Sequence, residues 1–142
     1  MVHGFTERQR QQADRAGDDR ALGFAPDFYN TLPRAGLPHE WAVHRDFELA
    51  ETAIPNKYKE LIGLAMAAHI KCRYCIYFHT QAARAFGATD EELKEAVFMG
   101  GLTVQYSNAI TGMRYDFEKF QGEVDRAIEF MTEQATTHQP TV

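Results

Sequence analysis

Two cysteines and a nearby histidine are the residues of this chain most able to do chemistry. Cys72 and Cys75 form a C-x-x-C pair, and His79 follows Cys75 by four residues. In a helix the three side chains would fall within about 60° around the axis, because each residue advances about 100°. Two thiols and an imidazole on one stripe predict redox chemistry or metal binding.

The local sequence contains features that favour a reactive thiolate, the form in which a cysteine attacks. A helix that begins near Lys71 would point N–H groups at Cys72, and Lys71 and Arg73 add positive charge there. His79 could instead accept the proton of Cys75. These features leave open which sulfur attacks. With two thiols on adjacent turns, one can attack a peroxide or disulfide and the other can resolve the product, after which an outside reductant must restore both thiols.

Glu60 is a candidate partner for His79, because a carboxylate often orients the base that activates a nucleophile. It precedes Cys72 by twelve residues. On one straight helix it would lie about 18 Å along the axis from Cys72, too far to touch His79. A turn near residues 69–71 would let two helices pack side by side and bring the carboxylate close. No Gly or Pro marks that turn, so the local pattern does not require it.

The pattern Glu60-x11-Cys72-Arg-Tyr-Cys75-x3-His79, followed by a helix end at residues 82–89, resembles the carboxymuconolactone decarboxylase superfamily. Within it, the chain is most similar to the alkylhydroperoxidase D-like branch, over residues 26–110. The resemblance implies an all-α, helical bundle that assembles as homo-trimers or homo-hexamers, with a break after the glutamate helix.

The same resemblance implies a peroxidase-like cycle. Cys75 would be the activated thiol, Cys72 its disulfide partner, and His79 the proton carrier, linked to Glu60 directly or through water. The reductant would be an external thiol, such as a lipoyl-type dithiol, and no bound cofactor or metal is implied. Tyr74 stands where the branch has a second histidine, so one member of the relay is replaced.

The remaining sequence also predicts helices and no strands. A short helix is expected over 26–32, and longer ones over 38–51 and 56–68. We expect the inward residues of the last two to be Trp41, Phe47, Ala50, Leu61, Ile62, Ala65 and Ala68.

The cysteine helix should end near Phe86, with Gly87 following it. Thr89-x-x-Glu92 is a capping box for the next helix. Its apolar residues 93–110, up to a stop at 111–112, predict burial on all sides, either within the subunit or across an interface. A final helix should carry a narrow apolar stripe and fray from residue 132. The stripe comprises Met113, Phe117, Phe120, Val124, Ala127, Ile128 and Met131.

Length and composition predict a single domain over residues 1–142, with a polar arm at 1–20. The chain is 44% hydrophobic and 25% charged with a net charge of −5, which argues against nucleic-acid binding and against disorder. The N-terminal stretch lacks the apolar segment of a secretory signal, and the longest apolar run, 61–68, is too short to span a membrane. We therefore expect a cytoplasmic protein with reduced thiols.

Other interpretations of the cysteine stripe are a redox-sensing or scaffold oligomer with little turnover, a pair of inert buried thiols, and a zinc-binding module. The zinc module would use Cys72, Cys75 and His79, with His69 as a possible fourth ligand. Haem attachment is excluded because Ile76, not His, follows the second cysteine. His39 and His44 are five residues apart, so they do not share a helix face as zinc ligands.

Overall fold

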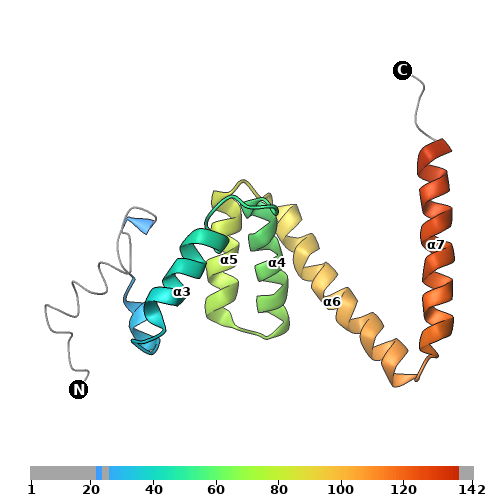
Figure 1. Ribbon diagram of the computed structural model, residues 1–142, viewed down its shortest axis with the longest axis horizontal. Coiled ribbons are helices and arrows are strands. Elements are labelled where there is room, and N and C mark those ends of the chain that lie inside the picture. The colour runs from blue at the N-terminus through green and yellow to red at the C-terminus, as the bar shows by residue number, and fades with distance from the viewer. Residues whose placement is uncertain (1–21, 24–25, 138–142) are drawn as a thin grey trace, which may run out of the picture. The chain divides into compact units, whose positions relative to one another are not determined.

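The computed structural model describes residues 22–23 and 26–137, and every regular element within them is a helix, as predicted (Figure 1). The polar arm expected over 1–20 lies outside the described residues. The chain divides between Phe98 and Met99 into two compact units.

The first unit opens with a 3₁₀-helix, η1 (Asp27–Thr31), and the α-helix α3 (Leu37–Val43). The single helix expected over 38–51 is wrong, because α3 continues as a π-helix, η2 (His44–Glu48). The N–H of Leu49 donates to the carbonyl of His44, five residues back, at 2.9 Å. A π-turn moves later side chains off the face that precedes it. Trp41, which precedes the π-helix, is buried as expected. Phe47 lies within the π-helix and is 58% exposed.

Two antiparallel helices, α4 (Asn56–His69) and α5 (Arg73–Ala85), pack side by side in the first unit (Figure 1). The core that they share with the start of the next helix consists of Leu64, Ala83, Ala88 and Leu93, with Leu61 and Ile76 against it. The expectation that Ile62 points inward is wrong, since it is 54% exposed. The buried face of α4 runs instead through Glu60, Leu64 and Ala67.

The turn between α4 and α5 is a Schellman motif, and it has no glycine. Lys71 adopts a left-handed φ of 57°. Its N–H donates to Ala68 at 3.3 Å, and the N–H of Cys72 donates to Ala67 at 3.1 Å. These two bonds satisfy the last carbonyls of α4. Cys72 thus closes one helix and is also the N-cap of the next.

The end of α5 uses the same motif with the residue expected from the sequence. Gly87 has a φ of 84°, and the N–H of Ala88 donates to Ala83 at 2.9 Å. The capping box that follows is also confirmed: the N–H of Glu92 donates to Thr89 Oγ1 at 3.1 Å, and the Thr89 N–H donates to Glu92 Oε2 at 2.8 Å. These contacts fix the start of α6 (Asp90–Gly112).

The helix α6 is far less buried than its composition suggested. Leu93 is its one buried residue, and Phe98 and Met99 are 73% and 60% exposed, so the expected burial of 93–110 is wrong for this single chain. No described atom lies within 4 Å of a Cβ built at Gly101. A helix that is apolar all round needs neighbours all round, but within the described part of the chain only Leu93 of α6 is buried.

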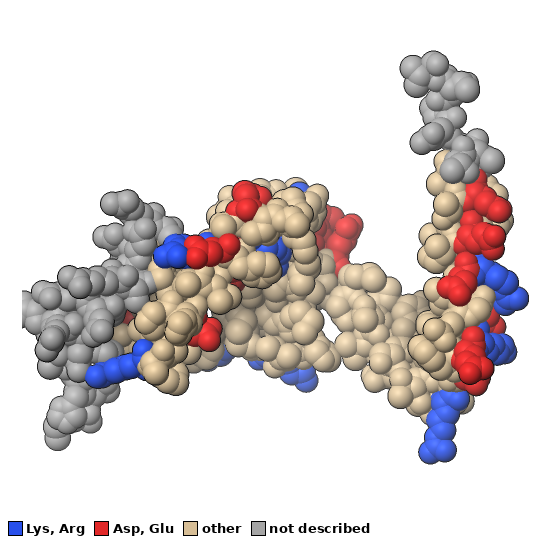
Figure 2. Space-filling model, in the orientation of Figure 1, with Lys and Arg blue, Asp and Glu red and all other residues tan. Residues whose placement is uncertain are grey.

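The last helix, α7 (Phe117–Thr137), begins four residues later than the expected stripe and continues past residue 132, so the predicted fraying is wrong up to 137. Arg114, in a left-handed conformation with φ 51°, follows the end of α6. Figure 2 shows charges of both signs along α7, whereas the charges of α6 are confined to its first two turns. No described helix combines the length and apolar content needed to cross a bilayer.

Candidate functional site

The two cysteines form a disulfide at the start of α5, with their Cα atoms 5.4 Å apart. The backbone N–H of Cys75 donates to Sγ of Cys72 at 3.3 Å. Both residues are half-buried, and the intervening Tyr74 is 75% exposed. The sulfur of Cys72 therefore lies at the positive end of a helix dipole, where negative charge on sulfur is stabilised.

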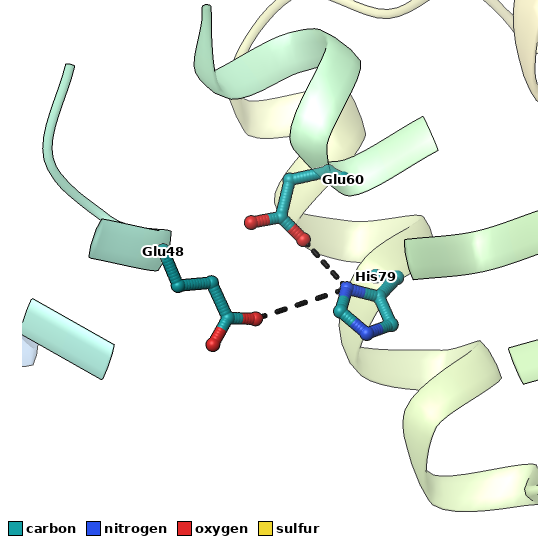
Figure 3. Close-up of side chains that lie close together, drawn as sticks. All are labelled: Glu48, Glu60 and His79. Atoms are coloured by element: carbon teal, nitrogen blue, oxygen red, sulfur yellow. Dashed lines mark hydrogen bonds and ion pairs between the residues drawn. The ribbon is translucent and has the colours of Figure 1, made fainter. Parts of the chain in front are cut away.

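The imidazole of His79 lies one helical turn beyond Cys75 and is bonded to Glu60 on the neighbouring helix (Figure 3). Its Nδ1 is 2.7 Å from Oε2 of Glu60, a carboxylate with no exposed surface. The side chain of His79 is 20% exposed. With Nδ1–H donating to the carboxylate, the imidazole is oriented and its Nε2 is the nitrogen that can exchange a proton.

Gly63, which the sequence reasoning missed, allows the ring of His79 to lie against α4. A Cβ at this position would be 2.5 Å from both Cε1 and Nδ1 of the imidazole. Only a residue without a side chain leaves room for this approach. The available signal was a glycine inside a helix, three residues after Glu60 and on the same face.

Glu48 is a second carboxylate beside His79, and it too was missed. Its Oε1 is 3.9 Å from Nδ1 of His79, and its Oε2 accepts a hydrogen bond from Nδ1 of His44 at 2.6 Å. This bond from His44 lowers the pKa of Glu48 below its usual value, although burial acts in the opposite direction. The signal was the pair His44-x3-Glu48, whose spacing places both side chains on one helical face.

Two polar side chains of α4 hold the segment around Glu48 in place. Nδ2 of Asn56 donates to the carbonyl of Leu49 at 2.8 Å, and the ammonium of Lys59 donates to the carbonyls of Phe47 and Ala50. Because these bonds join the end of η2 to the start of α4, Glu48 and Glu60 reach the same imidazole.

Aromatic rings form one wall of the site. The ring of Phe78 lies 5.8 Å from that of His44 and 5.2 Å from that of His79. Tyr29 lies 6.0 Å from the His44 ring, and burial, with the nearby charge of Glu48, raises the pKa of Tyr29 to about 12. Tyr29 is therefore a neutral phenol at physiological pH.

The buried carboxylate of Glu60 has one oxygen without a hydrogen bond. Its Oε1 finds no partner among the described residues, and the same holds for Nε2 of His44. A buried acceptor left unpaired costs about 1–3 kcal/mol. No contact within the described chain offsets the free-energy cost of burying Oε1 of Glu60.

The four residues singled out from the sequence fall into two directly bonded pairs, Cys72 with Cys75 and Glu60 with His79. The described chain assembles a group of three potential metal ligands from Glu48, Glu60 and His79, a group that does not include the sulfurs. His69, considered as a zinc ligand, is exposed at the end of α4.

Comparisons with known proteins agree with this architecture. Residues 35–116 match the carboxymuconolactone decarboxylase family. The crystal structure of the alkylhydroperoxidase AhpD core from Rhodospirillum rubrum superposes with a TM-score of 0.69 over 85% of this chain and 96% of that one, at 24% identity. At that identity the likeness concerns the fold.

A curated relative, uncharacterized protein 4 in the cox locus of Paracoccus denitrificans, is 38% identical over 50 residues. The match covers 35% of this chain and 45% of that protein, so the chain spans less than half the length of this relative. Because the family match extends over more than half of the sequence, the chain belongs to the carboxymuconolactone decarboxylase family, and its fold is of the AhpD type.

Proposed function

We propose that this protein is a thiol-dependent peroxidase or disulfide oxidoreductase of the alkylhydroperoxidase type. Cys75 and Cys72 alternate between dithiol and disulfide, His79 transfers protons, and Glu60 orients His79. The observation that carries the proposal is the 2.7 Å bond between His79 and the fully buried Glu60, one turn beyond the cysteine pair. A base held by a third group is the usual arrangement for activating a nucleophile.

The first half-reaction oxidises Cys75. Nε2 of His79 accepts the thiol proton, and the thiolate attacks the terminal oxygen of the hydroperoxide. The O–O bond breaks, the alkoxide leaves as an alcohol with the proton from His79, and Cys75 becomes a sulfenic acid. His79 is the group placed to serve Cys75, because it follows this cysteine by one helical turn.

The second half-reaction forms the disulfide. The sulfur of Cys72 attacks the sulfur of Cys75, the S–O bond breaks, and hydroxide leaves as water with the thiol proton of Cys72. The N–H of Cys75, 3.3 Å from Sγ of Cys72, stabilises negative charge on the resolving sulfur. The same contact helps this sulfur to leave when a reductant opens the disulfide.

An external dithiol of the lipoyl type closes the cycle by attacking the disulfide and leaving as its own disulfide. This requires a reducing compartment, and we place the protein in the cytoplasm. We also propose a homo-trimer or homo-hexamer. The exposed apolar side chains of α6, among them Phe98 at 73% and Met99 at 60%, support assembly because apolar patches mark interaction surfaces.

A second candidate is a redox sensor whose disulfide forms but turns over slowly. Tyr74, in the position of a relay histidine and 75% exposed, favours this candidate, because a phenol is a weak base and a weak acid at neutral pH. Steady-state turnover with dihydrolipoamide separates the two: a sensor forms one disulfide and stops.

The proposal is tested by consumption of an alkyl hydroperoxide with dihydrolipoamide as reductant. Wild type should turn over repeatedly, Cys75→Ser should consume none, and Cys72→Ser should accumulate a sulfenic acid at Cys75 that dimedone labels. Unchanged turnover in Cys75→Ser would refute the assignment. Turnover that is lost in neither single variant would show that the cysteine pair is not the redox centre.

A further inference from the structure

Three side chains from three separate elements converge on one point of the site. Glu48 comes from η2, Glu60 from α4 and His79 from α5, and each offers one donor atom within 4.8 Å of the other two. Figure 3 shows both carboxylates turned toward the imidazole. Their side chains are 29%, 0% and 20% exposed, so this is not an acidic patch on the surface.

The hydrogen bonds of this group are incomplete. The Nδ1–H of His79 can serve one carboxylate, and Glu60 takes it through Oε2 at 2.7 Å. Oε1 of Glu60 stays buried without a partner among the described residues. Lys59 acts on Glu48 through its charge, but its ammonium donates to two backbone carbonyls. Two carboxylates beside one imidazole, which carries at most one positive charge, leave the group of three with an excess of negative charge.

We propose that Glu48, Glu60 and His79 bind a divalent transition-metal cation, with zinc as the best-suited ion. One imidazole nitrogen and two carboxylate oxygens form a donor set that zinc accepts, with a further position open to solvent or substrate. The unpaired Oε1 of Glu60 supplies a carboxylate oxygen that has no hydrogen bond to lose among the described residues, and the cation takes the place of the proton between Nδ1 of His79 and Oε2 of Glu60.

The geometry requires only small side-chain rotations. Donors of a tetrahedral zinc with bonds of about 2.0–2.1 Å lie about 3.4 Å apart. The donors here span at most 4.8 Å, so the group has to contract and the backbone can stay in place. The bond of 2.6 Å from His44 to Oε2 of Glu48 orients that ligand from outside, as second-layer partners do in metal sites.

Metal binding would also act on the proposed function. A cation on Nδ1 of His79 replaces the proton there, and the ring then keeps its Nε2–H and cannot accept a proton from Cys75. The loaded state should therefore be inactive as a peroxidase. This consequence rests on the proposed function, whereas the binding itself does not.

The test uses the full chain with Cys72→Ser and Cys75→Ser combined, so that thiolates cannot hold the metal. Isothermal titration with zinc chloride should show one site per chain that Glu48→Gln weakens at least tenfold, since even outer partners of metal ligands contribute roughly 10–100-fold in affinity. Glu51→Gln, which changes an exposed carboxylate of the same segment, should leave the affinity unchanged.

Glu48→Gln is the main variant because Glu48 is partly exposed, and Glu60→Gln is a second one whose folding circular dichroism checks. A titration without heat or saturation in the thiol-free protein would overturn the inference, as would an affinity that Glu48→Gln leaves intact. Zinc binding by the thiol-free protein together with no turnover in metal-free wild type would refute the proposed function alone. Turnover in metal-free wild type together with no zinc binding by the thiol-free protein would refute the metal site alone.

Discussion

Glu60 and Glu48 face the same nitrogen of His79, but they do so in different ways. Glu60 is fully buried, comes from a regular helix and lies 2.7 Å from Nδ1. Glu48 is 29% exposed, comes from a π-helix and lies 3.9 Å away, with its second oxygen on His44. Glu60 contacts the imidazole of His79 alone, and Glu48 contacts both His79 and His44.

The difference indicates separate roles. A buried hydrogen bond to a charged group fixes geometry strongly, because the low local dielectric strengthens it. A longer, partly solvated contact contributes charge with little geometric control. Glu60 should therefore set the orientation of His79, and Glu48 should modulate its charge.

The largest effect is expected from Glu60→Gln, which keeps the shape of the side chain but removes the charge that orients His79. Positioned acid–base groups contribute about 10²–10⁴-fold to rate, so the steady-state kcat for hydroperoxide should fall by at least about 100-fold. Glu51→Gln should leave kcat unchanged. A fall in kcat of less than about twofold in Glu60→Gln would contradict the proposal that Glu60 orients His79.

Gly63→Ala should disturb the contact between Glu60 and His79 without changing any charge. Its Cβ would lie 2.5 Å from the imidazole, so the ring must move away from Glu60. Since a shift of about 1 Å can cost about 100-fold in rate, kcat should fall by roughly this factor.

Gly122→Ala is the matched control for Gly63→Ala, because no described atom lies within 4 Å of its Cβ. It should raise the free energy of unfolding by about 1 kcal/mol through helix propensity and leave kcat alone. If Gly63→Ala behaves like this control, the close contact between α4 and His79 does not contribute to kcat.

Glu48→Gln should have a smaller effect that depends on salt. Ion pairs of partly exposed side chains contribute about 0.2–1 kcal/mol, which corresponds to a loss of up to about fivefold in kcat. Because salt screens such pairs, the difference from wild type should shrink between low and high ionic strength. The loss in Glu60→Gln should be much less sensitive to salt, and equal sensitivity would contradict the proposed division of roles.

Thr89→Ala should affect stability and not the relay. It removes the side-chain acceptor of the capping box at the start of α6, a change that typically costs about 1 kcal/mol. Urea denaturation should show this loss while kcat stays within twofold of wild type. A large fall in kcat would mean that the losses in the site variants reflect general destabilisation.

The sequence predicted those parts of the molecule that depend on local rules. The capping box at Thr89 and the left-handed Gly87 follow from residue type and spacing, and the structure contains both. The turn at Lys71 has the same geometry as the turn at Gly87, but it lacks the residue that signals it. Packing of α5 against α4 overrides the local preference of Lys71, and propensity rules cannot show that.

The two carboxylates of the site also differ in how far the sequence predicted them. Glu60 could be proposed because its spacing to Cys72 matched a known pattern, whereas local reasoning left open whether a turn brings it close to His79. Glu48 belongs to a π-helix, an irregularity that residue preferences do not indicate. Burial of α6 within its own chain was not found, because composition predicts that apolar residues need cover but not whether the same chain or another subunit supplies it.

The central claim is that His79, held by Glu60, activates the thiol of Cys75. The most direct measurement is the rate at which iodoacetamide alkylates each cysteine of the reduced protein at pH 7, resolved by peptide mass spectrometry. His79→Asn should slow alkylation of Cys75 at least about tenfold and leave that of Cys72 nearly unchanged. Equal rates for Cys75 in wild type and in His79→Asn would contradict the account.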